Sequence, residues 1–263
     1  MATLTSDLIH VHLENGIKTI TINQPKKKNA LSFDMSATLR DIILESKDDD
    51  SQVLVLTGAG DNFCSGADLD PRAVNDPNFN VTEFLETVYN PTILGMRQMN
   101  KPIIAKVRGV CVGIGINFAL ACDLVYAEEN AVFSEAFVKI GLSSDGGGSF
   151  FMARHMGYHK AYELMVTGEA FDGKTAAGWG LINKAVPAGE LDALVDGMAH
   201  KLANGPSVCI RQTKANLRAA MEGGLADALQ QEAISQGINF VTHDFKEGVT
   251  AFLEKRKPVF KGK

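Results

Sequence analysis

Apolar and polar side chains alternate along residues 17–22, which read IKTITI. A period of two with β-branched residues is typical of a half-buried strand. Asn15 and Gly16 come directly before this segment and form a favoured hairpin turn, so residues 8–13 are expected to form an antiparallel partner strand. The pattern therefore predicts a β-hairpin near the start of the chain.

A helical spacing replaces the alternation after Ser32, which we expect to be the N-cap of a helix. The apolar face of this helix comprises Met35, Leu39, Ile42 and Ile43. The acidic run 48–50 is expected to end the helix in solvent, and residues 53–56 form a continuous apolar strand. From residue 103 to residue 127, an apolar strand, a glycine-rich turn, an apolar helix and a further strand follow one another. Such repeated strand and helix units predict an α/β core.

The pattern becomes helical from about Lys160 onwards. Apolar residues with helical spacing mark segments at 161–166, 175–179, 191–203, 207–221, 225–240 and 244–253. Some of these segments carry apolar faces that are long for a single small core, as in the set Leu191, Leu194, Met198 and Leu202. We therefore divide the chain into a core of residues 1–200 and a helical region of residues 201–263, and we expect it to assemble with copies of itself.

Composition and charge narrow the classes of function. The 263 residues are 45% hydrophobic and 22% charged, as in ordinary globular proteins. The formal net charge of -5 gives no overall basic field, so we expect no nucleic-acid partner. The sequence has no cationic start followed by an apolar run, and no apolar stretch of membrane-spanning length. We therefore expect no membrane partner and a cytoplasmic location.

Cysteine and histidine spacing does not indicate a metal site. The cysteines are Cys64, Cys111, Cys122 and Cys209. They include no CxxC pair, which favours reduced thiols over a disulfide framework or a zinc site. His155 and His159 are four residues apart, but no metalloprotease glutamate accompanies them. We therefore expect no bound metal.

Glycine-bearing segments carry the candidate chemistry. Residues 57–63 (TGAGDNF) begin like a dinucleotide fingerprint but lack its third glycine, which favours a tight turn. Residues 109–115 (GVCVGIG) join a strand to an apolar helix, and their backbone N–H groups either face a ligand oxygen or only allow close packing. In residues 133–149, Asp145 precedes three glycines, so it is either an acid beside a ligand or an Asx-turn or helix N-cap.

Taken together, these segments resemble the crotonase, or enoyl-CoA hydratase/isomerase, family. The similarity spans nearly the whole chain and lies in motifs in the same order, at Asn29-Ala30-Leu31, 63–69, 101–123, 133–148 and 247–256. It implies an α/β fold in which repeated ββα units form a spiral, followed by a C-terminal helical trimerisation region. It also implies an acyl-CoA substrate, a homotrimer or homohexamer, and no cofactor beyond the coenzyme A moiety of the substrate.

The resemblance further implies an oxyanion hole made of two backbone N–H groups, which map onto Ala67 and Ile114. Charge that develops on a thioester oxygen requires such donors, and each is worth about 3 kcal/mol in the transition state. The acyl pocket is expected at Asn117, Phe137 and Leu142, with the loop 71–84 as a further lining.

We expect the coenzyme A moiety to bind beside the cationic run 26–28, whose charge would attract its phosphates; a solvated turn is the alternative. The residues assigned to this site are Lys26, Lys28, Ala30, Ala67, Asp68 and Leu69.

Two positions depart from the hydratases of the family. Hydratases add water with two glutamates, and these positions correspond to Asn117 and Phe137, neither of which can act as a general acid or base. Asp145 instead lies where enoyl-CoA isomerases carry a catalytic carboxylate, and the chain is particularly similar to the enoyl-CoA isomerase of bacterial phenylacetate degradation. The resemblance therefore implies a shift of 3-enoyl-CoA to 2-enoyl-CoA with one aspartate base. We expect apolar neighbours such as Phe137, Ile140 and Leu142 to raise the pKa of Asp145.

Other functions remain open at this stage. A hydratase-like enzyme is one alternative. A 4-chlorobenzoyl-CoA dehalogenase would use the same aspartate as a nucleophile, but its partner histidine and tryptophan are not evident, since no histidine occurs between His12 and His155 and position 137 is phenylalanine. A non-catalytic acyl-CoA-binding protein is the alternative of another class, and the presence of Asp145 argues against it.

Overall fold

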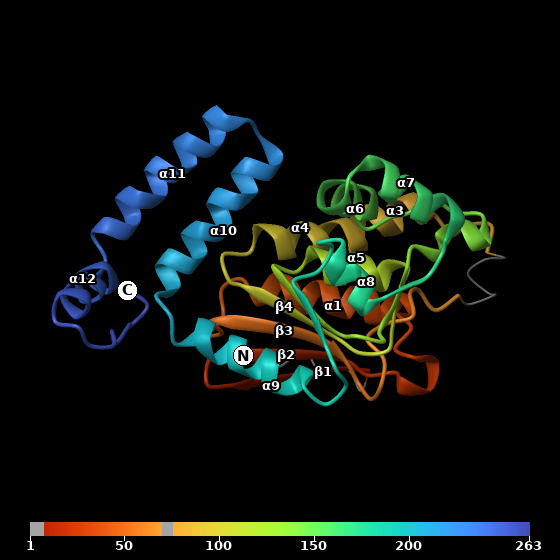
Figure 1. Ribbon diagram of the computed structural model, residues 1–263. Coiled ribbons are helices and arrows are strands. Elements are labelled where there is room, and N and C mark those ends of the chain that lie inside the picture. The colour runs from red at the N-terminus through yellow and green to blue at the C-terminus, as the bar shows by residue number, and fades with distance from the viewer. Residues whose placement is uncertain (1–7, 70–75) are drawn as a thin grey trace.

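A computed structural model describes residues 8–69 and 76–263 of the chain (Figure 1). Its centre is a six-stranded sheet in the order β1-β2-β3-β4-β6-β9. These strands are β1 (Ile9–Glu14), β2 (Ile17–Ile22), β3 (Val53–Gly58), β4 (Ile103–Val107), β6 (Leu124–Glu128) and β9 (Lys184–Val186). The predicted hairpin joins β1 to β2 in antiparallel register, and the other neighbours are parallel. Asn15 and Gly16 both take a positive φ, as a tight hairpin turn requires.

A second, three-stranded sheet is missing from the sequence-based prediction. It consists of β5 (Val110–Val112), β7 (Val132–Ser134) and β8 (Phe171–Asp172), in the order β5-β7-β8. Each strand has two or three residues, which is too short for a hydrophobic period to reveal. An isolated bridge between Cys64 and Cys111 adds the chain after β3 to this sheet. The two glycine-bearing segments around residues 66 and 113 therefore lie side by side.

Helices cover both faces of the larger sheet. On one face, Leu54 and Leu56 of β3 share a core with α1 (Phe33–Glu45), α4 (Asn90–Gln98) and α5 (Ile114–Ala121). On the other face, Val53 and Val55 pack against α9 (Leu191–Ala203). The remaining helices before α9 are η1 (Pro25–Lys27), α3 (Val81–Phe84), η2 (Leu85–Tyr89), η3 (Ala136–Ile140), α6 (Gly148–Met156), α7 (Tyr158–Thr167) and α8 (Gly173–Gly178). A helix on each side explains why β3 reads as a continuous apolar run.

The start and end of α1 are fixed by polar contacts. Ser32 caps the helix as predicted, because its hydroxyl oxygen accepts a hydrogen bond from the Met35 N–H at 3.2 Å. In the following acidic run, Asp48 and Asp50 are exposed as expected, but Asp49 between them is half-buried. Asp49 pairs with Lys18 and with the buried Lys101, whose Nζ lies 2.8 Å from Asp49 Oδ1. Burial alone would raise the pKa of Asp49, but hydrogen bonds led by the one from Lys101 hold it well below its ordinary value.

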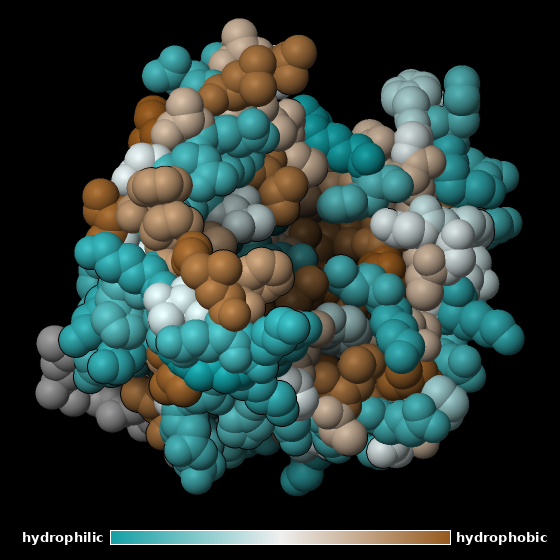
Figure 2. All heavy atoms as spheres, turned by 60° about the vertical axis from the view of Figure 1, so that its left-hand side comes forward, coloured by the Kyte–Doolittle hydropathy of each residue, from teal (hydrophilic) through white to brown (hydrophobic). Residues whose placement is uncertain are grey.

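Three helices at the C-terminal end project from this core (Figure 1): α10 (Ser207–Glu222), α11 (Leu225–Phe240) and α12 (His243–Leu253). Lys214 of α10 attaches them to the core, because its Nζ donates to Asp123 Oδ2 at 2.7 Å and to the Met96 carbonyl at 2.9 Å. Large apolar side chains stay exposed on these helices, including Leu217, Leu225, Leu229, Ile234, Ile238, Phe240, Phe252 and Leu253. Figure 2, which turns these helices toward the viewer, shows apolar side chains around a hollow in this face. Across residues 8–69 and 76–263, no helix has the length and apolar character needed to cross a membrane.

Candidate active site

Two glycines from distant parts of the chain touch each other at the centre of the site. An ideal Cβ on Gly113 would stand 3.7 Å from the Cα of Gly66. Both glycines have a positive φ, of 59° and 104°, which few other residues tolerate. The next residues are Ala67 and Ile114, and the N–H of Ile114, as the first residue of α5, has no acceptor within its helix. The contact thus brings the two predicted oxyanion-hole residues to the same place.

Phe137 and the Asp145 loop border this pair of glycines. The same ideal Cβ on Gly113 would stand 3.9 Å from Cζ of the Phe137 ring. On the other side, a Cβ on Gly146 would come within 2.2 Å of Ile114 Cδ1, so a side chain there would displace the end of the Ile114 side chain, and the positive φ of 55° also favours glycine. The acid Asp145 is therefore held directly beside Ile114 by packing of the next residue in the chain.

The carboxyl group of Asp145 is half-buried and does not cap a helix. Helix α6 has Gly147 as its N-cap and receives no side-chain cap. Among the described residues, Asp145 Oδ1 is buried without a hydrogen-bond partner. Burial raises the pKa of Asp145 to about 6. A carboxyl group with a free oxygen and a pKa near neutrality is suited to proton transfer, which favours the functional interpretation of the DGGG segment over a turn or cap.

The residues expected to line the acyl pocket lie in different environments. Asn117 on α5 is fully buried, and its Nδ2 donates to the backbone carbonyl of Asp145 at 2.8 Å. Phe137 on η3 is half-buried. Leu142 and Ile140 are more than half exposed, so they contribute less to the burial of Asp145 than expected. Residues 71–75 of the predicted loop lie outside the described residues.

Glu135 is a buried acid that the sequence analysis missed. This residue directly follows β7 and is only 1% exposed. Its Oε2 accepts a hydrogen bond from Ser144 Oγ at 3.0 Å. Its pKa is raised to about 7, because burial and, to a smaller extent, the charge of Asp145 raise it by more than the Ser144 hydrogen bond lowers it. The available signal was a glutamate between Phe133 and Phe137, because an acid among apolar residues is a candidate for burial, and a buried acid is uncommon enough to be informative.

The residues assigned to coenzyme A come together where the turn 25–30 meets the segment 65–69. The Ser65 N–H donates to the Lys28 carbonyl at 3.0 Å, and Leu31 bridges to Ala67. Lys27 pairs with Asp68 at 2.5 Å, whereas Lys26 and Lys28 of the same turn are exposed and form no ion pair with the described residues. Ala30 is buried in this contact, whereas Leu69 is exposed.

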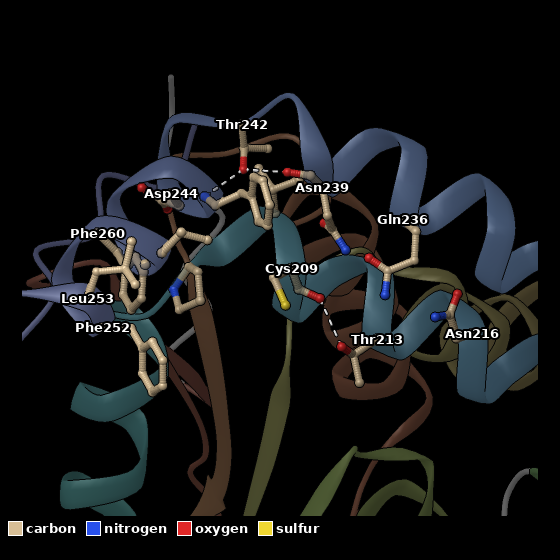
Figure 3. Close-up of a pocket in the computed structure, with 15 residues that line it drawn as sticks. Cys209, Thr213, Asn216, Gln236, Asn239, Thr242, Asp244, Phe252, Leu253 and Phe260 are labelled. Carbon is tan, nitrogen blue, oxygen red and sulfur yellow. Dashed lines mark hydrogen bonds between the residues drawn. The ribbon is translucent and has the colours of Figure 1, made fainter.

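Two cavities among the described residues bear on the location of the site. The larger, of about 500 Å³, lies among α10, α11 and α12 (Figure 3). Its walls are mostly apolar, with Phe252, Leu253 and Phe260 at one end and polar side chains such as Asn216 and Gln236 at the other. The smaller, of about 360 Å³, borders Gly146 and Gly147 and reaches α4, α6 and the end of α10. The larger cavity is therefore remote from the candidate acid, and the smaller one adjoins it.

Comparisons with known proteins agree with this arrangement. Residues 12–263 match the enoyl-CoA hydratase/isomerase family model. The chain is 34% identical to the 1,2-epoxyphenylacetyl-CoA isomerase of Escherichia coli strain K12, over 98% of this chain and 99% of that one. It is 33% identical to the crotonyl-CoA hydratase of Syntrophomonas wolfei, over 94% and 95% of the two chains.

A solved structure of an enoyl-CoA hydratase from Bacillus anthracis has a TM-score of 0.91 to this fold, with 28% identity, and 98% of this chain and 100% of that chain are covered. The predicted α/β fold class, the crotonase fold, is confirmed. The chain belongs to the enoyl-CoA hydratase/isomerase, or crotonase, family.

Proposed function

We propose that this protein is an enoyl-CoA delta isomerase, which converts a 3-enoyl-CoA thioester into the 2-enoyl-CoA. The proposal rests on the carboxyl group of Asp145. Its Oδ1 has no hydrogen-bond partner among the described residues, and the loop that bears it packs on Ile114. A carboxylate in this position is available to take a proton from a bound thioester. A pKa of about 6 leaves it mostly ionised at neutral pH and still basic enough to accept that proton.

In the proposed reaction, Asp145 removes a proton from C2 of the 3-enoyl thioester. The electron pair of the broken C–H bond moves toward the carbonyl, and the thioester oxygen takes the negative charge of a dienolate. The N–H groups of Ala67 and Ile114 stabilise that oxygen. Asp145 then returns its proton to C4, and the double bond moves from C3–C4 to C2–C3. One acid is sufficient because the group that takes the proton from C2 also returns it at C4, and no water is added.

A hydratase is the second candidate, because Glu135 supplies another carboxyl group close to Asp145 and because hydratases occur among the relatives. Hydration requires a group that activates water as well as one that delivers a proton. Glu135 is almost fully buried, and one of its oxygens already accepts the Ser144 hydroxyl. This carboxyl group is therefore poorly placed to meet a water molecule beside the substrate, which favours the isomerase.

The coenzyme A moiety is proposed to bind where Lys26 and Lys28 stand exposed beside the segment that leads to Ala67. Its phosphates would meet these two ammonium groups, while Lys27 stays paired with Asp68. The thioester would then extend toward the glycine pair at residues 66 and 113 and toward Asp145. This orientation places the charged end of the substrate at the surface and the reacting carbons in the half-buried site.

A homotrimer or homohexamer is proposed on the basis of the projecting C-terminal helices. Phe252 is 81% exposed and Leu253 is 73% exposed, beside an apolar cavity that opens among α10, α11 and α12. Apolar surface of this extent is unfavourable in water and is typical of an interface between subunits.

The proposed activity is tested by incubating the protein with straight-chain 3-enoyl-CoA and, separately, with 2-enoyl-CoA. An isomerase forms the conjugated 2-enoyl-CoA, which absorbs in the ultraviolet. In D2O, deuterium is incorporated at C4 when the proton held by Asp145 exchanges with solvent before it is returned to the substrate. Formation of 3-hydroxyacyl-CoA without isomerisation would identify a hydratase instead. Halide release from an aryl thioester would identify a dehalogenase, and binding without turnover would identify a non-catalytic protein.

A further inference from the structure

A chain of buried polar side chains supports the backbone of Asp145. Asn117 Nδ2 donates to the Asp145 carbonyl at 2.8 Å and lies 3.4 Å from Ser144 Oγ. Ser144 Oγ in turn donates to Glu135 Oε2 at 3.0 Å. Three side chains from α5, from the loop before α6 and from the end of β7 thus converge behind one acid.

Two acceptor atoms face the same small space without a donor. Glu135 Oε1 and Asn117 Oδ1 are both buried and have no hydrogen-bond partner among the described residues. A Cβ on Gly148 would stand 2.6 Å from the first and 2.7 Å from the second, so both oxygens border the gap left by this glycine. If the glutamate were ionised, two buried acceptors would border the same gap without a donor, which is unfavourable. A single proton on Glu135 Oε1 resolves the conflict, because it can be donated to Asn117 Oδ1.

The alternative orientation of the amide does not help. If Asn117 turned its oxygen toward Asp145, that oxygen would face the Asp145 carbonyl, which is another acceptor. The hydrogen bonds therefore favour the orientation with Nδ2 on that carbonyl, in which a protonated glutamate can supply the missing donor.

We propose that Glu135 is a positioning residue for Asp145: it keeps a proton, donates it to the Asn117 amide oxygen, and so fixes the amide that holds the Asp145 backbone. This inference rests on the proposed role of Asp145 as the base. Gly148 is part of the arrangement, because any side chain there would fill the gap and clash with Ser144 Oγ, 2.2 Å away.

The titratable groups around Glu135 favour the neutral, protonated form of its carboxyl group. Asp145 and Cys111 are the titratable groups that interact with it, and burial keeps the thiol of Cys111 protonated by raising its pKa. No cation within residues 8–69 and 76–263 forms an ion pair with Glu135. Burial raises the pKa of Glu135 to about 7 and the charge of Asp145 adds to the effect, so Asp145 ionises first.

These protonation states predict a bell-shaped dependence of kcat/KM on pH. The base has to be ionised, so activity rises as the pH passes about 6, where Asp145 loses its proton. The positioning residue has to stay protonated, so activity falls as the pH rises through about 7. The two carboxyl groups are coupled, and the two apparent pKa values therefore belong to the pair.

Two substitutions test this role. Glu135→Gln supplies an amide N–H in place of the acid proton and cannot titrate, so it should retain most of the kcat and lose the fall on the alkaline side. Glu135→Leu fills similar space without a donor, so Asp145 should lose its support and shift. The kcat should then drop by about 10- to 100-fold, because proton transfer depends steeply on the position of the base, while KM should change little. Ser134→Ala is the matched control: it removes a buried hydroxyl of the adjacent residue, which donates to the Gly168 carbonyl, and should leave the pH profile unchanged.

Infrared spectroscopy of the full-length protein tests the proton itself without relying on turnover. A carboxylic-acid C=O band that titrates near neutral pH, present in the wild-type protein and absent from Glu135→Gln, is expected. Absence of that band, or an unchanged alkaline limb in an active Glu135→Gln enzyme, would overturn the role of Glu135. If the band is present but no 3-enoyl-CoA is isomerised, the proton on Glu135 stands and the proposed isomerase activity fails.

Discussion

The side chain of Ile114 fills the space that a side chain on Gly146 would need, since an ideal Cβ there would lie 2.2 Å from Ile114 Cδ1. One of these residues supplies a candidate oxyanion-hole amide, and the other follows the candidate base. The contact therefore packs the two parts of the proposed machinery against each other.

Gly146→Ala should move Asp145 away from the backbone N–H of Ile114. The substitution adds a clash to the cost of a left-handed backbone at φ 55°, and we expect kcat to fall about 100-fold through displacement of Asp145. Gly141→Ala is the control, because Gly141 has a comparable φ of 76° but nothing within 4 Å of its Cβ position. It should cost only about 1 to 2 kcal/mol of stability. Equal activity of the two variants, measured under conditions where both are folded, would mean that this contact does not position Asp145.

Replacing Lys26 and Lys28 together by alanine should weaken the binding of coenzyme A and reduce its dependence on salt. Both lysines are exposed cations beside the predicted phosphate site, and exposed charges attract less as ionic strength rises. Titration calorimetry with coenzyme A at two salt concentrations measures the effect. The double replacement of Lys184 and Lys201, which are exposed on β9 and α9, has the same change in net charge. An identical affinity and salt slope in both double variants would leave the turn as a solvated surface.

Sedimentation velocity at micromolar concentration should detect a trimer or a hexamer. Phe252→Glu places a charge on an 81% exposed apolar position of α12 and should shift the distribution toward monomer. Lys255→Glu, just beyond α12, changes charge nearby without removing apolar surface and should keep the assembly. A wild-type protein that sediments as a stable monomer would contradict the proposed assembly.

The sequence predicted the parts of the fold that have a long hydrophobic period. The hairpin of β1 and β2, the capped helix α1 and the long helices α9 and α11 all follow from their own residues. The second sheet does not, because β5, β7 and β8 are short and form only through pairing with distant segments. Tertiary contacts override local pattern in such strands.

The residues of the candidate site likewise include some that the local sequence reveals and some that only the folded chain reveals. Asp145 and the glycines around residues 66 and 113 were identifiable because an acid or a bare backbone in an apolar context is locally visible. Glu135 was missed because its role depends on Ser144 and Asn117, which only the folded chain brings within hydrogen-bonding distance. The pairing of Lys27 with Asp68, 41 residues later, is equally invisible in the sequence.

Asp145 is proposed as the general acid and base of a double-bond isomerase. Asp145→Asn keeps the shape of the side chain and removes its titrating oxygen, so the fold and the binding of acyl-CoA should persist. The deciding measurement is the turnover of 3-enoyl-CoA by Asp145→Asn beside its affinity for a non-reactive saturated acyl-CoA. We expect isomerisation to fall by at least about 1,000-fold, within the range attributed to general acid–base catalysis, while the affinity stays within about threefold of wild type. Near-normal turnover by Asp145→Asn would contradict the proposed role of Asp145 as the general acid and base.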